Sequence, residues 1–154
     1  MHPRRKDGED AGVVESAARS TALTAVDLAF AEPVRARALA SAAVQAAPRD
    51  PQTRSMSERA LGVAALSLQQ LAEGERHLRA AIGIAEEAGL EVRAAEARGS
   101  LAYLLVLTGR SAEALEAADR SLPVLTGLSR ARVFMLRALV LVELGRFDAA
   151  LGGF

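Results

Sequence analysis

Two stretches of this chain repeat each other without a gap at a spacing of 36 residues, and this repeat constrains the fold most. Residues 101–115 and 137–151 each hold an apolar run, then Gly-Arg, then Ala-Leu four residues further on. Helices commonly end at a glycine in the left-handed conformation, which suits Gly109 and Gly145. The repeat therefore predicts a helical hairpin that is made twice.

A looser copy of the hairpin runs from about Thr53 to Gly89. Residues 71–88 carry apolar side chains at spacings of three and four, which is typical of an amphipathic helix. Gln69 stands where the later copies have glycine, so this turn needs another closure. A weaker hairpin is predicted over 13–47, with a break before Pro33, because proline suits the first turn of a helix.

These patterns predict an all-α fold with eight helices in one domain. Connections of two to five residues make consecutive helices antiparallel. A polar leader is expected to be disordered over residues 1–12, and the domain over 13–154 divides into hairpins at about 13–47, 53–89, 91–124 and 129–154, the last incomplete. The predicted helices are 13–31, 33–47, 52–69, 72–88, 91–108, 111–123, 129–144 and 147–154.

Composition supports helices and excludes several functions. Alanine, the best intrinsic helix former, is the commonest residue, and no β-branched alternation of strand length occurs. Because 19 basic residues balance 19 acidic ones, the chain lacks the positive excess of nucleic-acid binders. Cysteine is absent, the start lacks the apolar core of a signal peptide, and no apolar run reaches membrane-span length. We expect a cytoplasmic protein without nucleic-acid or membrane partners.

The repeat resembles the tetratricopeptide family, in which a small residue follows Leu, Gly precedes the second helix, and Ala is followed by an aromatic residue four positions on. The periods of 36 and 40 residues exceed the family's usual 34, and the closing proline is missing. The resemblance implies a right-handed α-solenoid of antiparallel hairpins that binds other proteins. The best-matching copy consists of Phe134, Ala138, Leu141, Gly145, Phe147, Ala150 and Phe154, and the next of Leu101, Ala102, Leu105, Gly109 and Ala114.

The Ala- and Arg-rich style of residues 76–81 and 85–90 resembles the amino-terminal repeats of actinobacterial CHAT proteins, where helical repeats precede a caspase-like domain. This resemblance implies a bacterial protein-interaction scaffold, the amino-terminal module of a longer signalling or effector protein. The alternative is the helical sensory region of a large ATPase-type transcription regulator. A small helical hydrolase is the third hypothesis, and the one least supported.

No catalytic, cofactor or metal site is predicted. A metal site needs several converging ligands, and His77 has neither a second histidine nor cysteine beside it. We therefore interpret His77 as a solvated surface residue. Glu73, Glu75 and Arg79 form ordinary pairs along the same helix. The serines have no histidine in register, so an activated nucleophile is not indicated.

The resemblance places the first helix of each hairpin along a concave groove for a peptide or helix. The alternative is that further repeats or an attached effector domain cover this face permanently. The groove residues it implies are Arg59, Val63 and Leu66, then Gly99, Tyr103 and Val106, then Arg132, Met135, Leu139 and Val142, whereas Leu101, Leu105, Phe134, Ala138 and Leu141 point into the repeat interior.

The carboxyl end stops inside its own pattern. The hairpin opened at Ser129 has room for a second helix of under three turns at residues 147–154. Repeat arrays normally end in a helix with a polar outer face. We therefore expect a fragment of a longer protein, in which helix 129–144 leaves apolar surface uncovered. That surface would self-associate or bind the continuation.

Overall fold

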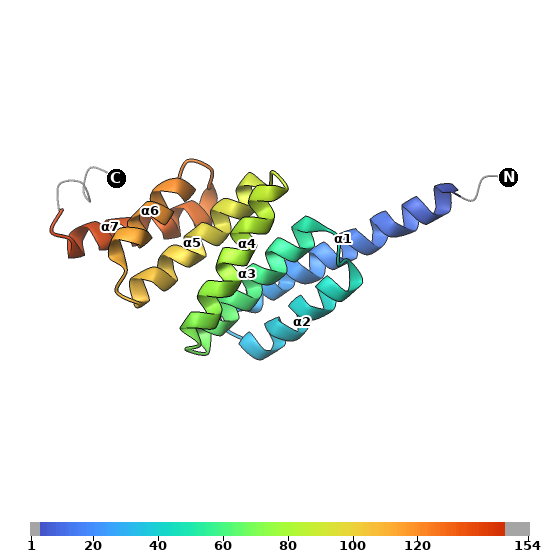
Figure 1. Cartoon of the computed structure of the whole chain (residues 1–154), viewed down its shortest axis with the longest axis horizontal. Coiled ribbons are helices and arrows are strands. Elements are labelled where there is room, and N and C mark those ends of the chain that lie inside the picture. The colour runs from blue at the N-terminus through green and yellow to red at the C-terminus, as the bar shows by residue number, and fades with distance from the viewer. Residues whose placement is uncertain (1–3, 147–154) are drawn as a thin grey trace.

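A computed structural model describes residues 4–146 of the chain, and these residues form only helices and their connections. The all-α prediction is confirmed. None of the described helices is long and apolar enough to cross a membrane. In chain order the helices are α1 (Arg4–Leu28), α2 (Pro33–Ala46), α3 (Pro51–Ser67), α4 (Leu71–Glu87), α5 (Glu91–Leu107), α6 (Ser111–Ser121) and α7 (Gly127–Glu143) (Figure 1).

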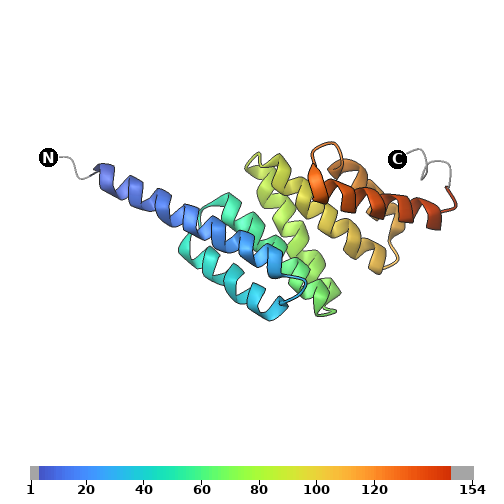
Figure 2. The ribbon, with the colours of Figure 1, turned by 180° about the vertical axis from the view of Figure 1, so that it is seen from behind.

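The helices form an open array of hairpins. Consecutive helices pack in pairs, and α1, α3, α5 and α7 also contact one another in that order. Within the described residues α1 makes no contact with α5 or α7, and the two lie at opposite ends of an elongated molecule (Figures 1 and 2). A closed bundle would bring the first and last helices together. The chain is therefore a helical repeat, whose right-handedness stays a prediction.

The predicted disordered leader is wrong over residues 4–12, because α1 begins at Arg4 and continues without a break to Leu28. Pro3 precedes the helix, and Asp7 lies in its first turn, where a negative charge interacts favourably with the helix dipole. Neither glycine of this segment is followed by a proline or a cap that would end the helix. The side chains of residues 6–17 are all exposed, so this stretch projects from the body as a helix (Figure 2).

The end of α1 comes at Leu28 and not at residue 31, and the other predicted boundaries agree with the structure to within two residues. Pro33 begins α2, as predicted, and α6 ends at Ser121, shortly before Pro123. The helix α7 begins at Gly127, two residues earlier than expected. The predicted helix 147–154, and with it the incomplete fourth hairpin, lies outside the described residues.

The turns that follow α3, α4, α5 and α7 share one backbone closure, in which one residue has positive φ. Gly109 and Gly145 have φ of 73° and 71°, as the repeat predicts, and Gly89 has 69°. Gln69 adopts the same conformation, with φ of 62°, and Gln70 N–H donates to the carbonyl of Ala65 at 2.8 Å. A non-glycine residue in this region carries a steric cost of about 1–2 kcal/mol. The turn between α3 and α4 therefore keeps the common closure with a strained residue.

We predict that Gln69→Gly raises the free energy of unfolding by about 0.5–1 kcal/mol, because glycine relieves the Cβ clash at positive φ. The matched variant Gly109→Ala should lower it by about 1 kcal/mol for the same reason. Urea unfolding followed by circular dichroism measures both changes. Equal stability of Gln69→Gly and the native chain would contradict the strain at this turn.

The amino-terminal half of the core is built from alanine layers. Each layer takes one buried side chain from each of α1, α2 and α3. In two layers all three buried residues are alanine, which lets the three backbones approach closely, and in the third Met56 fills the α3 position. The layers are Ala22–Ala43–Met56, Ala25–Ala40–Ala60 and Ala29–Ala36–Ala64.

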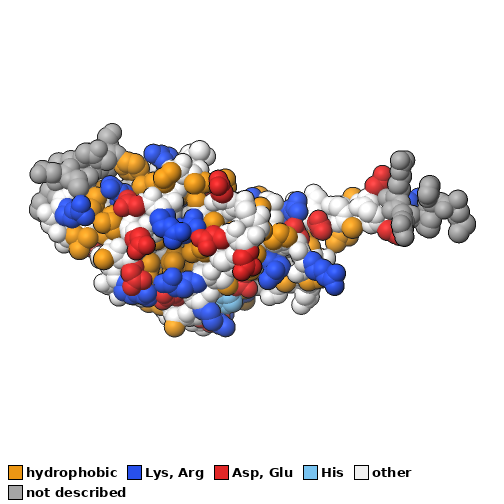
Figure 3. Space-filling view, turned by 45° about the horizontal axis from the view of Figure 1, so that its top comes forward, with side chains coloured by type: hydrophobic (Ala, Val, Ile, Leu, Met, Phe, Trp, Pro, Cys, Tyr) orange, Lys and Arg blue, Asp and Glu red, His pale blue; other side chains and the backbone are white. Residues whose placement is uncertain are grey.

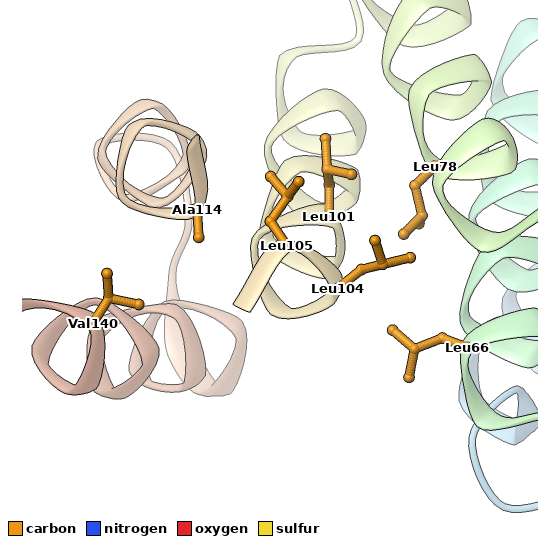
Figure 4. Packing of buried hydrophobic residues seen from close by; sticks show 7 residues of the cluster. All are labelled: Leu66, Leu78, Leu101, Leu104, Leu105, Ala114 and Val140. Carbon is orange, nitrogen blue, oxygen red and sulfur yellow. The ribbon is translucent and has the colours of Figure 1, made fainter. Parts of the chain in front are cut away.

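The carboxyl-terminal half of the core uses leucine, and α3 and α4 cross there at two glycines. A Cβ placed on Gly62 would lie 2.6 Å from Cγ of Leu78, and one on Gly74 would lie 3.1 Å from the carbonyl oxygen of Gly62. Leu78 and Leu104 are fully buried next to this crossing (Figure 4). The missing side chains are therefore what allows the leucines to fill the junction of α3, α4 and α5.

We predict that Gly62→Ala destabilises the chain by about 1–3 kcal/mol, because the added methyl overlaps the Leu78 side chain. Gly83→Ala in α4 is the control, since a Cβ there meets no atom within 4 Å. It should stabilise the helix by about 0.5–1 kcal/mol. Thermal unfolding of the two variants should shift in opposite directions. A melting temperature of Gly62→Ala above that of the native chain would refute the tight crossing.

Asp50 joins α1 to the start of α3. Its carboxylate accepts hydrogen bonds from Arg19 Nε at 2.8 Å and Nη2 at 2.6 Å, and from the backbone N–H of Thr53 at 3.0 Å. The Asp50 side chain is only 3% exposed. The Arg19 hydrogen bonds, and then those of Thr53, hold the pKa of Asp50 well below its ordinary value. Asp50 thus acts both as the helix cap and as the partner of Arg19.

We predict that Asp50→Asn lowers the free energy of unfolding at neutral pH by about 2 kcal/mol, because it leaves the cap but removes the charge facing Arg19. A depressed pKa contributes stability above the unfolded value near 4 and loses it as pH falls further. The native chain should therefore weaken below about pH 4 more steeply than the variant. Urea unfolding between pH 7 and 3 measures this. Parallel pH profiles would contradict the role of the Asp50 charge.

Candidate interaction surface

The first helices α1, α3, α5 and α7 line one side of the array, which we call the first-helix face, and α7 and α1 come to the front in Figure 2. The structure places most of the predicted groove residues at the surface of these helices, with the amount of exposed side chain rising toward α7. Arg59, Val63, Gly99 and Val106 are half-buried, and Tyr103, Arg132, Met135, Leu139 and Val142 are exposed.

Leu66 is the exception, and its assignment to the groove is wrong. The residue is 4% exposed and packs with Leu78 and Leu104 in the core cluster (Figure 4). The helix α5 lies against both α3 and α4, so it covers the carboxyl-terminal half of α3. The register of one helix could not reveal this, because the cover comes from the next hairpin. Of the residues assigned to the interior, Leu101, Leu105 and Leu141 are buried, whereas Phe134 and Ala138 are half-buried.

The half-buried charges of the first-helix face form a network around Arg59. Arg59 Nε donates to Ser100 Oγ at 3.1 Å, and its Nη1 lies 3.4 Å from Glu96 Oε2. Arg93 Nη1 donates to the same Glu96 oxygen at 3.0 Å. Two arginines thus share one carboxylate between α3 and α5.

The side chain of Arg59 is largely buried within this network, and both burial and neighbouring charges shift its pKa. Desolvation lowers the pKa of Arg59, the Glu96 charge opposes that shift, and Arg93 and Arg132 add to it. Asp27 of α1 also favours the charged guanidinium. Residues of the other three first helices therefore act on this cation, and a negative charge entering this face would find surplus positive charge.

Beyond this network, α7 carries an uncovered apolar stripe. Met135 is 68% exposed, Leu139 53% and Val142 43%, and their spacing of four and three places them on one side of the helix. Arg132 lies three residues before Met135 on that side. Tyr103 of α5 is 43% exposed. The described end of the array therefore presents apolar side chains next to a cation, as the sequence predicted for helix 129–144.

The second helices α2, α4 and α6 carry a different surface. Their backbones do not approach each other within the described residues, but long side chains join them. Arg110, the residue just before α6, lies 2.8 Å from Glu75 of α4, and Arg37 of α2 lies 3.3 Å from Glu73. Burial works against the charged form of Glu75, but hydrogen bonds from Arg110 and Arg79 outweigh it and lower its pKa. Acidic and basic groups alternate across the view in Figure 3.

His77 belongs to this outer charge pattern, and its interpretation as a solvated residue is wrong. Its side chain is 18% exposed, and Nδ1 lies 2.6 Å from Oε2 of Glu58 in α3. The predicted neighbour Glu73 lies 3.6 Å from Nε2. The sequence reveals the Glu73 spacing within α4, but the contact with Glu58 depends on how α3 and α4 pack. His77 thus connects the two helices of one hairpin.

Two shallow recesses lie near the ends of helices. One is lined by residues 10–15 of α1 and by the turn 46–50, and the other lies between Gln52 and the start of α5. Among the residues that the structure describes, no three acidic or histidine side chains gather as metal ligands would. No protein-family model matches the chain, and a search of the curated proteins finds no match either.

Proposed function

We propose that the chain is a protein-interaction scaffold that binds an acidic, partly apolar protein segment on its first-helix face and catalyses no reaction. The observation that carries this proposal is the uncovered stripe of Met135, Leu139 and Val142 on α7 beside Arg132. Exposed apolar stripes next to a cation suit an amphipathic helix with a carboxylate at its edge.

Two further observations support binding at this face. The group around Arg59 holds three arginines, Arg59, Arg93 and Arg132, and two carboxylates, Glu96 and Asp27, so an added carboxylate is favoured. Tyr and Arg are also overrepresented among residues that dominate binding energy, which fits Tyr103 and Arg132. The outer face of α4 and α6 already pairs its charges internally and offers less to a partner. Attachment to a longer CHAT-type or ATPase-type protein stays a prediction of the sequence resemblance.

The proposal predicts the outcome of a selection from a displayed library of random peptides. Peptides selected on the native chain should share apolar residues at helical spacing with Asp or Glu beside them. Arg132→Glu should weaken their binding about tenfold or more, because it replaces attraction by repulsion. Fluorescence anisotropy with a labelled selected peptide measures the dissociation constant.

The matched control is Arg76→Glu, which makes the same charge change on an exposed arginine of α4. It should leave the dissociation constant nearly unchanged. Equal losses in both variants would show that only net charge matters. Selected peptides that bind Arg132→Glu as well as the native chain would rule out the first-helix face as the binding site.

A further inference from the structure

The amino-terminal part of α1 is a helix whose described side chains are exposed. We call residues 4–17 the arm. All its described side chains, those of residues 6–17, are exposed, and in both ribbon views the arm extends past α2 and α3 into open space (Figures 1 and 2). Residues with such exposure contribute little to the core. A helix of four turns is marginal alone in water, so a partner would stabilise the arm.

One side of the arm continues the buried stripe of α1. Ala18 and Ala22 of that stripe are buried in the body, and Val14 and Ala11 extend it toward the amino terminus at the same helical spacing. Asp10, Ala11, Val14 and Glu15 together line the open recess beside the turn 46–50. The arm therefore presents apolar side chains flanked by carboxylates on the side where a packing helix would lie.

The charge of residues 7–15 of the arm complements the first-helix face. This segment has four carboxylates, Asp7, Glu9, Asp10 and Glu15, and no basic residue, whereas the first three residues of the arm, Arg4, Arg5 and Lys6, are basic. The stripe on α7 has the opposite character, since Arg132 precedes Met135 and Leu139 on the same side. An acidic, partly apolar helix is the kind of segment that the proposed function assigns to this face.

The arm cannot reach the α7 stripe of its own chain. It is part of one continuous helix, and it extends away from the body at the end of the molecule opposite to α7 (Figure 1). A contact between the two surfaces therefore requires two molecules.

We propose that the arm of one chain binds the first-helix face of a second copy. Val14 packs against the Met135–Leu139 stripe, and Asp10 pairs with Arg132. This inference rests on the proposed function, because it names the segment that the face binds. The contact is head to tail, since the arm and the stripe are different surfaces. Its electrostatic part weakens as salt rises, and its apolar part remains.

The test uses two full-length variants, Asp10→Arg in the arm and Arg132→Glu on the face. Analytical ultracentrifugation should show that the native chain associates. The dissociation constant of each variant alone should be higher by about tenfold or more. An equimolar mixture of the two variants should associate again, because each arm then meets a face of opposite charge on the other molecule. Circular dichroism confirms that both variants are folded.

The matched control is Glu87→Arg, which makes a carboxylate-to-arginine change on an exposed residue of α4. Glu87 lies outside both the arm and the first-helix face, so this variant should associate like the native chain. A monomeric native chain, or association that neither variant weakens, would overturn the inference. So would failure of the mixed variants to associate. If the face still binds selected peptides in that case, the proposed function stands and only the arm is excluded as its partner.

Discussion

The close approach of helix backbones is the constraint on which the rest of this structure depends. Gly62 and Gly74 let α3 and α4 cross so tightly that an added Cβ would overlap Leu78. Alanine layers bring α1 and α2 against α3 in the same way. Small side chains bury little area each, so stability comes from many close contacts rather than from a few large residues. This explains how a chain with 3% aromatic residues forms a continuous core.

The two sides of the array distribute charge differently, and function follows from that difference. On the second helices, Glu75 faces Arg110 and Glu113 faces Arg79 of the neighbouring hairpin, so the pairs hold adjacent repeats in register. Such exposed pairs each contribute little free energy. On the first helices, Arg59 and Arg93 share the single carboxylate of Glu96. Surplus positive charge next to uncovered apolar side chains distinguishes the face that we propose to bind a partner.

The match between sequence and structure differs from element to element for physical reasons. The turns at Gly109 and Gly145 were predictable, because glycine at positive φ is a local property. Gln69 shows the limit of that rule, since the fold imposes the same closure on a residue that resists it. The helix at residues 4–12 was missed because a polar, glycine-containing segment resembles a disordered leader. Composition alone does not show that the helix formed by the later part of α1 continues back through this segment.

The sequence by itself determined most of the helices, their antiparallel pairing and the exposed side of α7. These properties depend on helical spacing and on short connections, which are local. Only the tertiary structure decided which surface residues remain accessible and which charges meet. Leu66 is buried by α5, His77 meets Glu58 across α3 and α4, and Arg59 meets Glu96 across α3 and α5. Each of these contacts depends on how one helix stacks against another, and the register of a single helix does not show which residues of other helices it meets.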